Sequence, residues 1–157
     1  MPKRYTYRKA TAEELASGSP EMIEILVEVT TAGSAGSVIR LGLYSSSDCI
    51  PTDLIADYET VPADSLGIKT IVISQTLTPG LYFIALNHNS TTSMGFRSVS
   101  NDACPPVLGL PATFGTTLTA NSITSNLTYT TMPSTFTTSG MAASGAGYIP
   151  DVRVRLS

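Results

Sequence analysis

The side chains that could do chemistry in this sequence are few and widely spaced. The one histidine, His88, lies in "NHNST", and a base for nucleophilic attack could be built from it only with Cys49 or Cys104. Nothing in the sequence fixes these residues close together, and no Cys-x-x-Cys pair is present. We therefore expect no catalytic residue, no transition-metal site, no cofactor and no enzyme activity.

A group of carboxylates lies between residues 48 and 64, and its members are Asp48, Asp53, Asp57, Glu59 and Asp64. Carboxylate oxygens are ligands for Ca²⁺, but these residues lack the Asp-x-Asp-x-Asp-Gly loop pattern. The alternate positions of Asp57 and Glu59 instead favour the solvated face of a strand. The plain surface interpretation is preferred over calcium binding, and we assign no metal ligand.

Two further groups of residues have two interpretations each. Cys49 and Cys104 are too few for a disulfide framework, so they either pair where two loops meet or remain partly buried thiols. Five aromatic side chains also have two interpretations. They could line a platform on which a glycan stacks, or they could fill the core, and we prefer the core interpretation. These rings are Tyr44, Tyr58, Tyr82, Phe83 and Phe96.

Composition restricts the class of protein. The chain has 157 residues, which suits one domain, and its net charge is −3 with 13% charged residues. There is no basic field of the kind that nucleic acid requires, no apolar run of about 20 residues, and no signal-peptide core at the start. We expect synthesis in the cytoplasm, no nucleic-acid partner and no membrane insertion.

Residues 1–20 are expected to form an N-terminal docking arm. The first ten residues carry four bases and no acid. In "TAEELAS", Thr11 and Glu14 have capping-box spacing, which predicts a helix of one to two turns that needs docking for stability. The residues of the arm expected to contact a partner are Lys3, Arg4, Tyr5, Tyr7, Arg8 and Lys9.

Residues 21–157 are expected to form an all-β domain, an antiparallel β-sandwich with a jelly-roll-like character. "EMIEILVEVT" alternates with period two, and "SVIRLGLYS" follows a Gly-rich turn, so the two runs resemble a hairpin. The first run places on one face Ile23, Ile25, Val27 and Val29, and the second places on one face Ile39, Leu41 and Leu43.

Further strands are expected in "LIADYETVP", "GIKTIVISQ", "LYFIALN", a short run around 94–99, and "DVRVRLS". The segment "SSSDCIPTD" is expected to be a loop. Pro79 and Gly80 suit a type II turn that joins two central strands, with Gly80 at positive φ. In the last strand, Val152, Val154 and Leu156 are expected to face inward.

The order of these segments resembles a known module. "VEVTTAGSAGSVIRLGLYSSS", "PTDLIADYETV" and "GIKTIVISQTLTPGLYFIAL" together look like a β-sandwich module of tailed-bacteriophage virion proteins, of the tail-fibre, minor tail or decoration type, and "IPDVRVRLS" is similar to its closing strand. The chain departs from the module at "CIPTD", which replaces a Gly-rich loop, and at Phe83, where Trp is common. The module also has another strand upstream, where this chain has the arm.

The resemblance implies a non-enzymatic virion structural protein, displayed on the particle and docked to other virion proteins through the arm, as a tail fibre, an adaptor or a capsid decoration. The uncharged stretch 103–150 suits a homo-oligomeric interface, with a trimer favoured. The alternative is a module that binds a host surface carbohydrate. Its contacts would come from loops 45–53 and 87–106, and the residues expected to face a receptor are Asp48, Asp53, His88 and Asn89.

Overall fold

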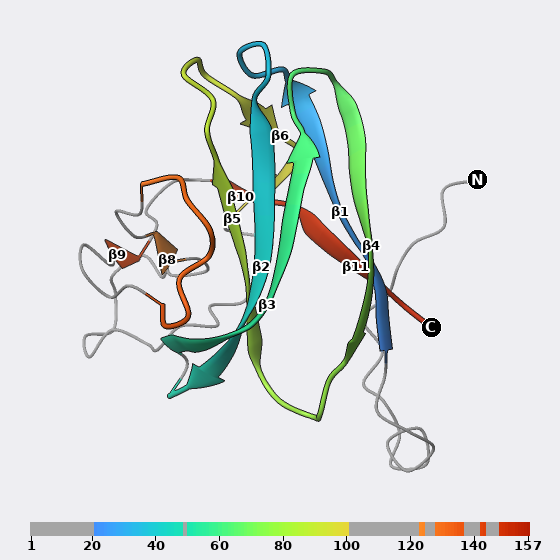
Figure 1. Ribbon diagram of the computed structural model, residues 1–157, viewed down its shortest axis with the longest axis vertical. Coiled ribbons are helices and arrows are strands. Elements are labelled where there is room, and N and C mark those ends of the chain that lie inside the picture. Colours follow the sequence, from blue (N-terminus) through green and yellow to red (C-terminus); the bar gives the residue numbers. More distant parts are fainter. Residues whose placement is uncertain (1–20, 49, 101–122, 125–127, 137–141, 144–147) are drawn as a thin grey trace.

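The computed structural model describes residues 21–48, 50–100, 123–124, 128–136, 142–143 and 148–157. Within these ranges the protein is all-β and has no helix, and its long strands form two antiparallel sheets that lie face to face (Figure 1). This β-sandwich-like architecture confirms the all-β prediction. The docking arm, its short helix, Cys49 and Cys104 lie outside the described residues.

The first sheet is built around β1 (Glu21–Thr31) and is called the β1 sheet below. On one side β1 pairs with β4 (Gly67–Thr76). On the other side it pairs with β11 (Val152–Leu156) and, further along, with β6 (Gly95–Phe96). The predicted terminal strand is therefore confirmed, and it lies at the end of the sheet.

The second sheet has three strands and is called the β2 sheet. Its centre is β2 (Val38–Ser47), which pairs with β3 (Ile50–Pro62) and with β5 (Tyr82–His88). The predicted strands "SVIRLGLYS", "LIADYETVP" and "LYFIALN" are confirmed, and so is "GIKTIVISQ", which forms β4 in the other sheet.

The core lies between the two sheets and is made by the two central strands. Inward residues of β1 and β2 are almost completely buried, because each central strand has a neighbour on both sides and a sheet above it. Burying an aliphatic side chain of this size stabilises the fold by about 1.5–3 kcal/mol. The buried cluster consists of Ile25, Val27, Val29, Ile39, Leu41 and Ala63.

The predicted hairpin between β1 and β2 is wrong, because these strands belong to different sheets. Their loop crosses from one sheet to the other, which lets the apolar faces of both strands meet in the core. Gly36 in this loop has φ of 74°, a left-handed conformation that glycine adopts without the steric cost of a side chain. The turn itself was predicted correctly, but not the strands that it joins.

A β-bulge changes the inward face of β1. The register shifts between Met22 and Glu24 in the pairing with both neighbours. Met22 is therefore buried, at 3% exposure, while Ile23 is only partly buried. The prediction for Ile23 is wrong, since a bulge reverses the alternation of side chains on its N-terminal side.

Two turn predictions are also wrong. Residues 45–53 were predicted to be a loop but are mostly strand. Strand β2 continues to Ser47, β3 begins at Ile50, and the two form a tight hairpin. The Pro79–Gly80 turn joins end strands of different sheets, β4 and β5, instead of two central strands. Gly80 does not have a left-handed φ, so the turn lacks the type II geometry.

The two ends of the segment 101–147 meet at a fork beside β1. The chain leaves β6 through Arg97 into β7 (Ser98–Ser100), and β7 pairs with β10 (Tyr148–Pro150), which leads into β11. Within the segment, β8 (Ile123–Thr124) pairs with β9 (Ala142–Ala143). The short strands β6 and β7 confirm the run predicted around 94–99.

Candidate interaction surfaces

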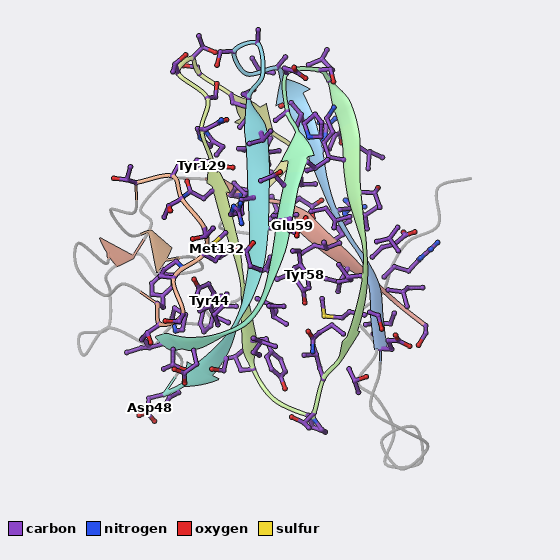
Figure 2. The ribbon with its side chains drawn as sticks, viewed as in Figure 1. Tyr44, Asp48, Tyr58, Glu59, Tyr129 and Met132 are labelled. Carbon is purple, nitrogen blue, oxygen red and sulfur yellow. The ribbon has the colours of Figure 1, made fainter. Side chains whose placement is uncertain are left out.

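The residues predicted to face a receptor lie at opposite ends of the sandwich. Asp48 and Asp53 belong to the β2–β3 hairpin end, and Figure 2 shows Asp48 at its tip. His88 pairs with Ile39, near the first residue of β2, and is therefore at the other end of the same strand. Asp48 and Asp53 therefore belong to one hairpin and His88 and Asn89 to the opposite end of the sandwich, so the structure does not bring the four residues together.

At the hairpin end, the two acids Asp48 and Asp53 are both exposed but differ in their backbone. Asp48 is exposed and has φ of 52°, which is one of the two left-handed conformations among described residues other than glycine. Asp53 is exposed, and its backbone forms a bridge with Thr135. The free carboxylate of Asp48 is available to a partner at this end, but no further group of the hairpin joins it.

At the other end, Asn89 and His88 differ in what they can offer. The Asn89 Oδ1 atom accepts a hydrogen bond from the amide of Val38 at 2.8 Å, so this side chain caps the start of β2. The imidazole of His88 is partly buried, 6.2 Å from the ring of Phe96, and its Nδ1 atom is buried without a hydrogen-bond partner. Only the exposed Asn89 faces solvent.

None of the five candidate aromatic rings is exposed. The preferred core interpretation holds for Tyr58 and Phe96, whereas Tyr44 is buried on the opposite face of the β2 sheet. Tyr44 is 1% exposed, and Tyr58 and Phe96 pack against the core cluster. Burial raises the pKa of Tyr58, whose hydroxyl has no hydrogen-bond partner. Tyr82 and Phe83 are partly buried. These rings therefore do not form a flat aromatic platform for a sugar.

Sequence reasoning missed a second layer of packing over the outer face of the β2 sheet. The segment 128–136 lies on this face, with Met132 placed over Gly42 and the ring of Phe136 meeting that of Tyr44 edge to face at 5.4 Å (Figure 2). The Tyr44 hydroxyl donates to the carbonyl of Pro133 at 2.9 Å. The available signal was the lack of charged or strongly polar residues at Gly42 and Tyr44, which alternate with the core residues Leu41 and Leu43 and so belong to the opposite face of the strand.

A charged pair anchors the same segment. Asp57, predicted to be a solvated surface acid, accepts from Arg40 Nη1 at 2.6 Å and from the Met132 amide at 3.0 Å. Burial acts to lower the pKa of Arg40, while its hydrogen bonds with Tyr129 and Asp57 act to raise it. Together the hydrogen bonds outweigh burial, so the pKa of Arg40 lies above its ordinary value. The pair is a structural element, because the Asp57 carboxylate bonds both Arg40 and the backbone of the segment.

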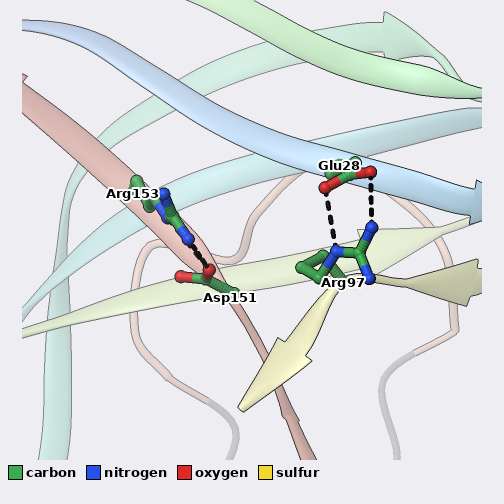
Figure 3. A network of polar contacts seen from close by, with 4 residues as sticks. All are labelled: Glu28, Arg97, Asp151 and Arg153. Carbon is green, nitrogen blue, oxygen red and sulfur yellow. Dashed lines mark hydrogen bonds and ion pairs between the residues drawn. The ribbon is translucent and has the colours of Figure 1, made fainter. Parts of the chain in front are cut away.

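Ion pairs also fasten the fork on the outer face of the β1 sheet (Figure 3). Arg97 donates to both carboxylate oxygens of Glu28 at 3.0 Å, and Arg153 binds Asp151. The hydrogen bond from Arg97 lowers the pKa of Glu28, and the same bond raises the pKa of Arg97. Arg155 with Glu24 adds a third pair at 2.6 Å, so the β11 side of this sheet is charged.

The β4 side of the same face is apolar. Ile68 and Val72 point outward from β4, because their partners in β1 are the outward residues Glu28 and Glu24. They are 69% and 79% exposed, and Leu66, just before β4, is 66% exposed. These are the three most exposed large hydrophobic residues in the described part of the chain. We call Leu66, Ile68 and Val72 the β4 patch.

The remaining searches of the described residues give negative findings. No group of three or more His, Cys, Asp or Glu residues is placed to hold a metal ion, in the ranges that the structure covers. Among those same residues, no helix is long and apolar enough to cross a membrane. No protein-family model, curated protein or solved structure matches the chain.

Proposed function

We propose that this protein is a non-enzymatic structural protein of a bacteriophage virion. Its sandwich is displayed on the particle, and residues 1–20 dock it to other virion proteins, as part of a tail fibre, an adaptor or a capsid decoration. The proposal places the protein in the virion after synthesis in the host cytoplasm. It begins from the resemblance of the segments 27–47, 51–61 and 67–86 to a tail-protein module.

The observation that carries the proposal is the order of the strands. From β1 to β6, each connection crosses between the sheets except the β2–β3 hairpin. In one sheet β1 lies between β4 and, on its other side, β11 and β6, and the other sheet has the order β5-β2-β3. Apart from β11, this order is consistent with the last six strands of an eight-stranded jelly roll, a fold common in viral capsid proteins. We therefore propose that the sandwich is of the jelly-roll type.

The exposed β4 patch supports a role in assembly. Three large apolar side chains on one sheet face are a cost to a solitary soluble domain, and such patches are typical of surfaces that contact another protein. Contact with a neighbouring virion protein, or with a further copy of the chain, would remove this surface from water. The trimer expected from the uncharged stretch 103–150 remains part of the proposal.

Detection of the chain in purified particles tests the proposal. Mass spectrometry of particles separated on a density gradient should find the protein, and antibodies raised against residues 21–157 should label intact particles in electron micrographs. The position of the label, on the head or on the tail, assigns the location. A chain found only in the soluble lysate, with unlabelled particles, would refute the proposal.

The arm is tested by charge removal. A chain in which Lys3, Arg4, Arg8 and Lys9 are all changed to Gln should keep its circular dichroism spectrum and lose incorporation into particles. The matched control changes Glu13 and Glu14 to Gln, which removes charge from the same arm with the opposite sign. Equal incorporation of both variants would show that the basic residues do not dock the protein.

The alternative function is a module that binds a host carbohydrate, and jelly-roll wiring is also found in lectins. Because the predicted loops lie at opposite ends, one glycan could contact only one end of the sandwich, and the end with the exposed Asn89 offers the more polar loop. A glycan array with residues 21–157 should then give hits that are lost with Asn89→Ala. An array without hits removes this alternative.

A further inference from the structure

Strand β4 ends the β1 sheet and, among the described strands, pairs only with β1. With respect to the described residues, the backbone groups on its outer side are therefore open to a further strand. Soluble proteins usually protect such an edge with charges, proline or a covering segment. In β4 the outward side chains are Ile68, Thr70, Val72 and Ser74, and none of them is charged.

The other side of the sheet is protected in the ordinary way. Beside β1, the β11 side carries Arg153 and Arg155 with their carboxylate partners, and Arg97 with Glu28 lies further along. Lys69 is the one charged residue of β4, but it belongs to the inward face, and its Nζ atom donates to the Ser65 Oγ atom at 2.8 Å. Of the two sides of the β1 sheet, the outward face without charges is therefore that of β4.

The outward residues of β4 are self-complementary about Thr70. In an antiparallel pair of identical strands centred on this residue, Thr70 lies opposite Thr70 of the second copy. Ile68 then lies opposite Val72, and Val72 opposite Ile68. Thr–Thr pairs across strands are stabilising, and an Ile–Val pair removes apolar surface from water.

We propose that β4 pairs with β4 of a second copy of this chain, antiparallel and about a two-fold axis at Thr70. The two β1 sheets then form one continuous sheet across the axis, and the β4 patch of each copy meets that of the other on the same outer face. No like charges are brought opposite each other in this arrangement, because the outward face of β4 has no charge. This contact does not depend on the virion role.

The occupant is a second copy because the two-fold arrangement closes. If β4 paired with a different edge, such as that of β5, each molecule would leave a free edge and the contacts would propagate into a filament. Pairing single strands also makes a small interface, below about 1,200 Å². We therefore expect a reversible dimer whose population rises with protein concentration.

Analytical ultracentrifugation over a concentration series is the first test. The chain should sediment as monomer and dimer, and Thr70→Lys should halve the mass of the assembly, because it places two lysines opposite each other across the axis. If the chain also forms a trimer elsewhere, the same variant still halves the mass. The matched control is Thr92→Lys, the same change at an exposed residue in the loop after β5, and it should keep the mass of the wild type.

Three results of this experiment would overturn the proposal. They are a wild-type monomer at every concentration up to about 1 mM, an assembly whose mass Thr70→Lys leaves unchanged, and a series of open polymers. Circular dichroism of the two variants shows that they are folded, since both substitutions are at exposed positions.

A cross-link tests the register. In a chain with Cys49 and Cys104 changed to Ser, Thr70→Cys places two thiols opposite each other, and directly paired residues of antiparallel strands have Cα atoms about 4.5–5.5 Å apart, which a disulfide can span. Oxidation should convert this variant to covalent dimer at least ten times faster than Thr92→Cys in the same background. Equal rates for the two variants would refute the two-fold register.

Discussion

Removing one hydroxyl group from Tyr44 tests whether the segment 128–136 is bound to the outer face of the β2 sheet. Tyr44→Phe keeps the ring and its edge-to-face contact with Phe136, but it removes the hydrogen bond to the carbonyl of Pro133. The Tyr44 side chain is 1% exposed and its hydrogen bond is partly buried, so water replaces the lost donor poorly at this position. The variant should therefore be less stable than the wild type.

The magnitude follows from the kind of bond. A neutral hydrogen bond contributes about 0.5–1.5 kcal/mol to stability, and here the acceptor is a backbone carbonyl left without its partner. We expect a loss of about 1 kcal/mol in the free energy of unfolding. For a chain of this size the melting temperature should fall by about 2–4 °C.

The assay is urea unfolding followed by circular dichroism, because the chain has no tryptophan. Hydrogen exchange adds a local measurement: the amides of Leu54 and Phe136 bond the carbonyls of Ser134 and Thr52, and both should exchange faster in the variant. The matched control is Tyr82→Phe, which removes a donor to the carbonyl of Thr78 at an exposed bond. This control should change stability by less than about 0.5 kcal/mol.

Two results would refute the reasoning about this segment. One is a Tyr44→Phe variant as stable as the wild type, with unchanged exchange at both amides. The other is an equal loss of unfolding free energy in Tyr44→Phe and Tyr82→Phe. Burial of the Tyr44 hydroxyl would then not strengthen its hydrogen bond to Pro133.

Three other predictions concern single contacts. The pKa of Glu28 is lowered from its ordinary value of 4.5, so the stability that its ion pair contributes is complete above pH 4.5 and is lost as the pH falls through the lower folded value. Urea midpoints measured from pH 7 to pH 3 should therefore fall more steeply for the wild type than for Glu28→Gln. Parallel curves would contradict this. A Cβ atom at Gly42 would lie 2.9 Å from Met132 Cγ, so Gly42→Ala should be destabilising and Met132→Ala should offset part of that cost. A double-mutant cycle should give a coupling of about 1 kcal/mol. Strict additivity of the two free-energy changes would show that the two residues do not touch. Asn89→Ala should lower the free energy of unfolding, measured by thermal unfolding, by about 0.5–1 kcal/mol, because it removes the acceptor of the Val38 amide. Asn89→Asp should lower it much less, because the aspartate keeps that acceptor. Equal losses in the two variants would show that Asn89 does not cap β2.

Much of the fold could be predicted from alternation along the chain. The pattern in "VIRLGLYS" predicts the buried face of β2 correctly, and Ile39 and Leu41 are both 0% exposed. Alternation could not say which strands are neighbours, because the hairpin and the crossing between sheets use the same Gly-rich turn. The bulge at Met22 was equally out of reach, since it depends on the registers of β4 and β11 against β1.

The interaction surfaces were less accessible from sequence. Polar residues such as Asp53 and His88 were chosen for their chemistry, yet the structure places them at opposite ends and leaves His88 partly buried. The β4 patch was missed because "GIKTIVISQ" reads as an ordinary strand with both faces apolar, and only the pairing order shows that one face and one edge are open. A strand buried on both sides would have the same sequence pattern.

The fork beside β1 has a consequence for how such a protein can vary. Because β7 and β10 are hydrogen-bonded to each other, the chain enters and leaves the segment 101–147 at a single point of the sandwich. Among the described residues, the strand pairs of the β1 and β2 sheets use no residue of this segment, and residues 128–136 cover one outer face. The segment thus has the geometry of an insertion that begins and ends at one place beside β1. Connecting segments tolerate insertions and deletions better than the strands that they connect, so a change of length here should be accepted more easily than one within β1 or β2.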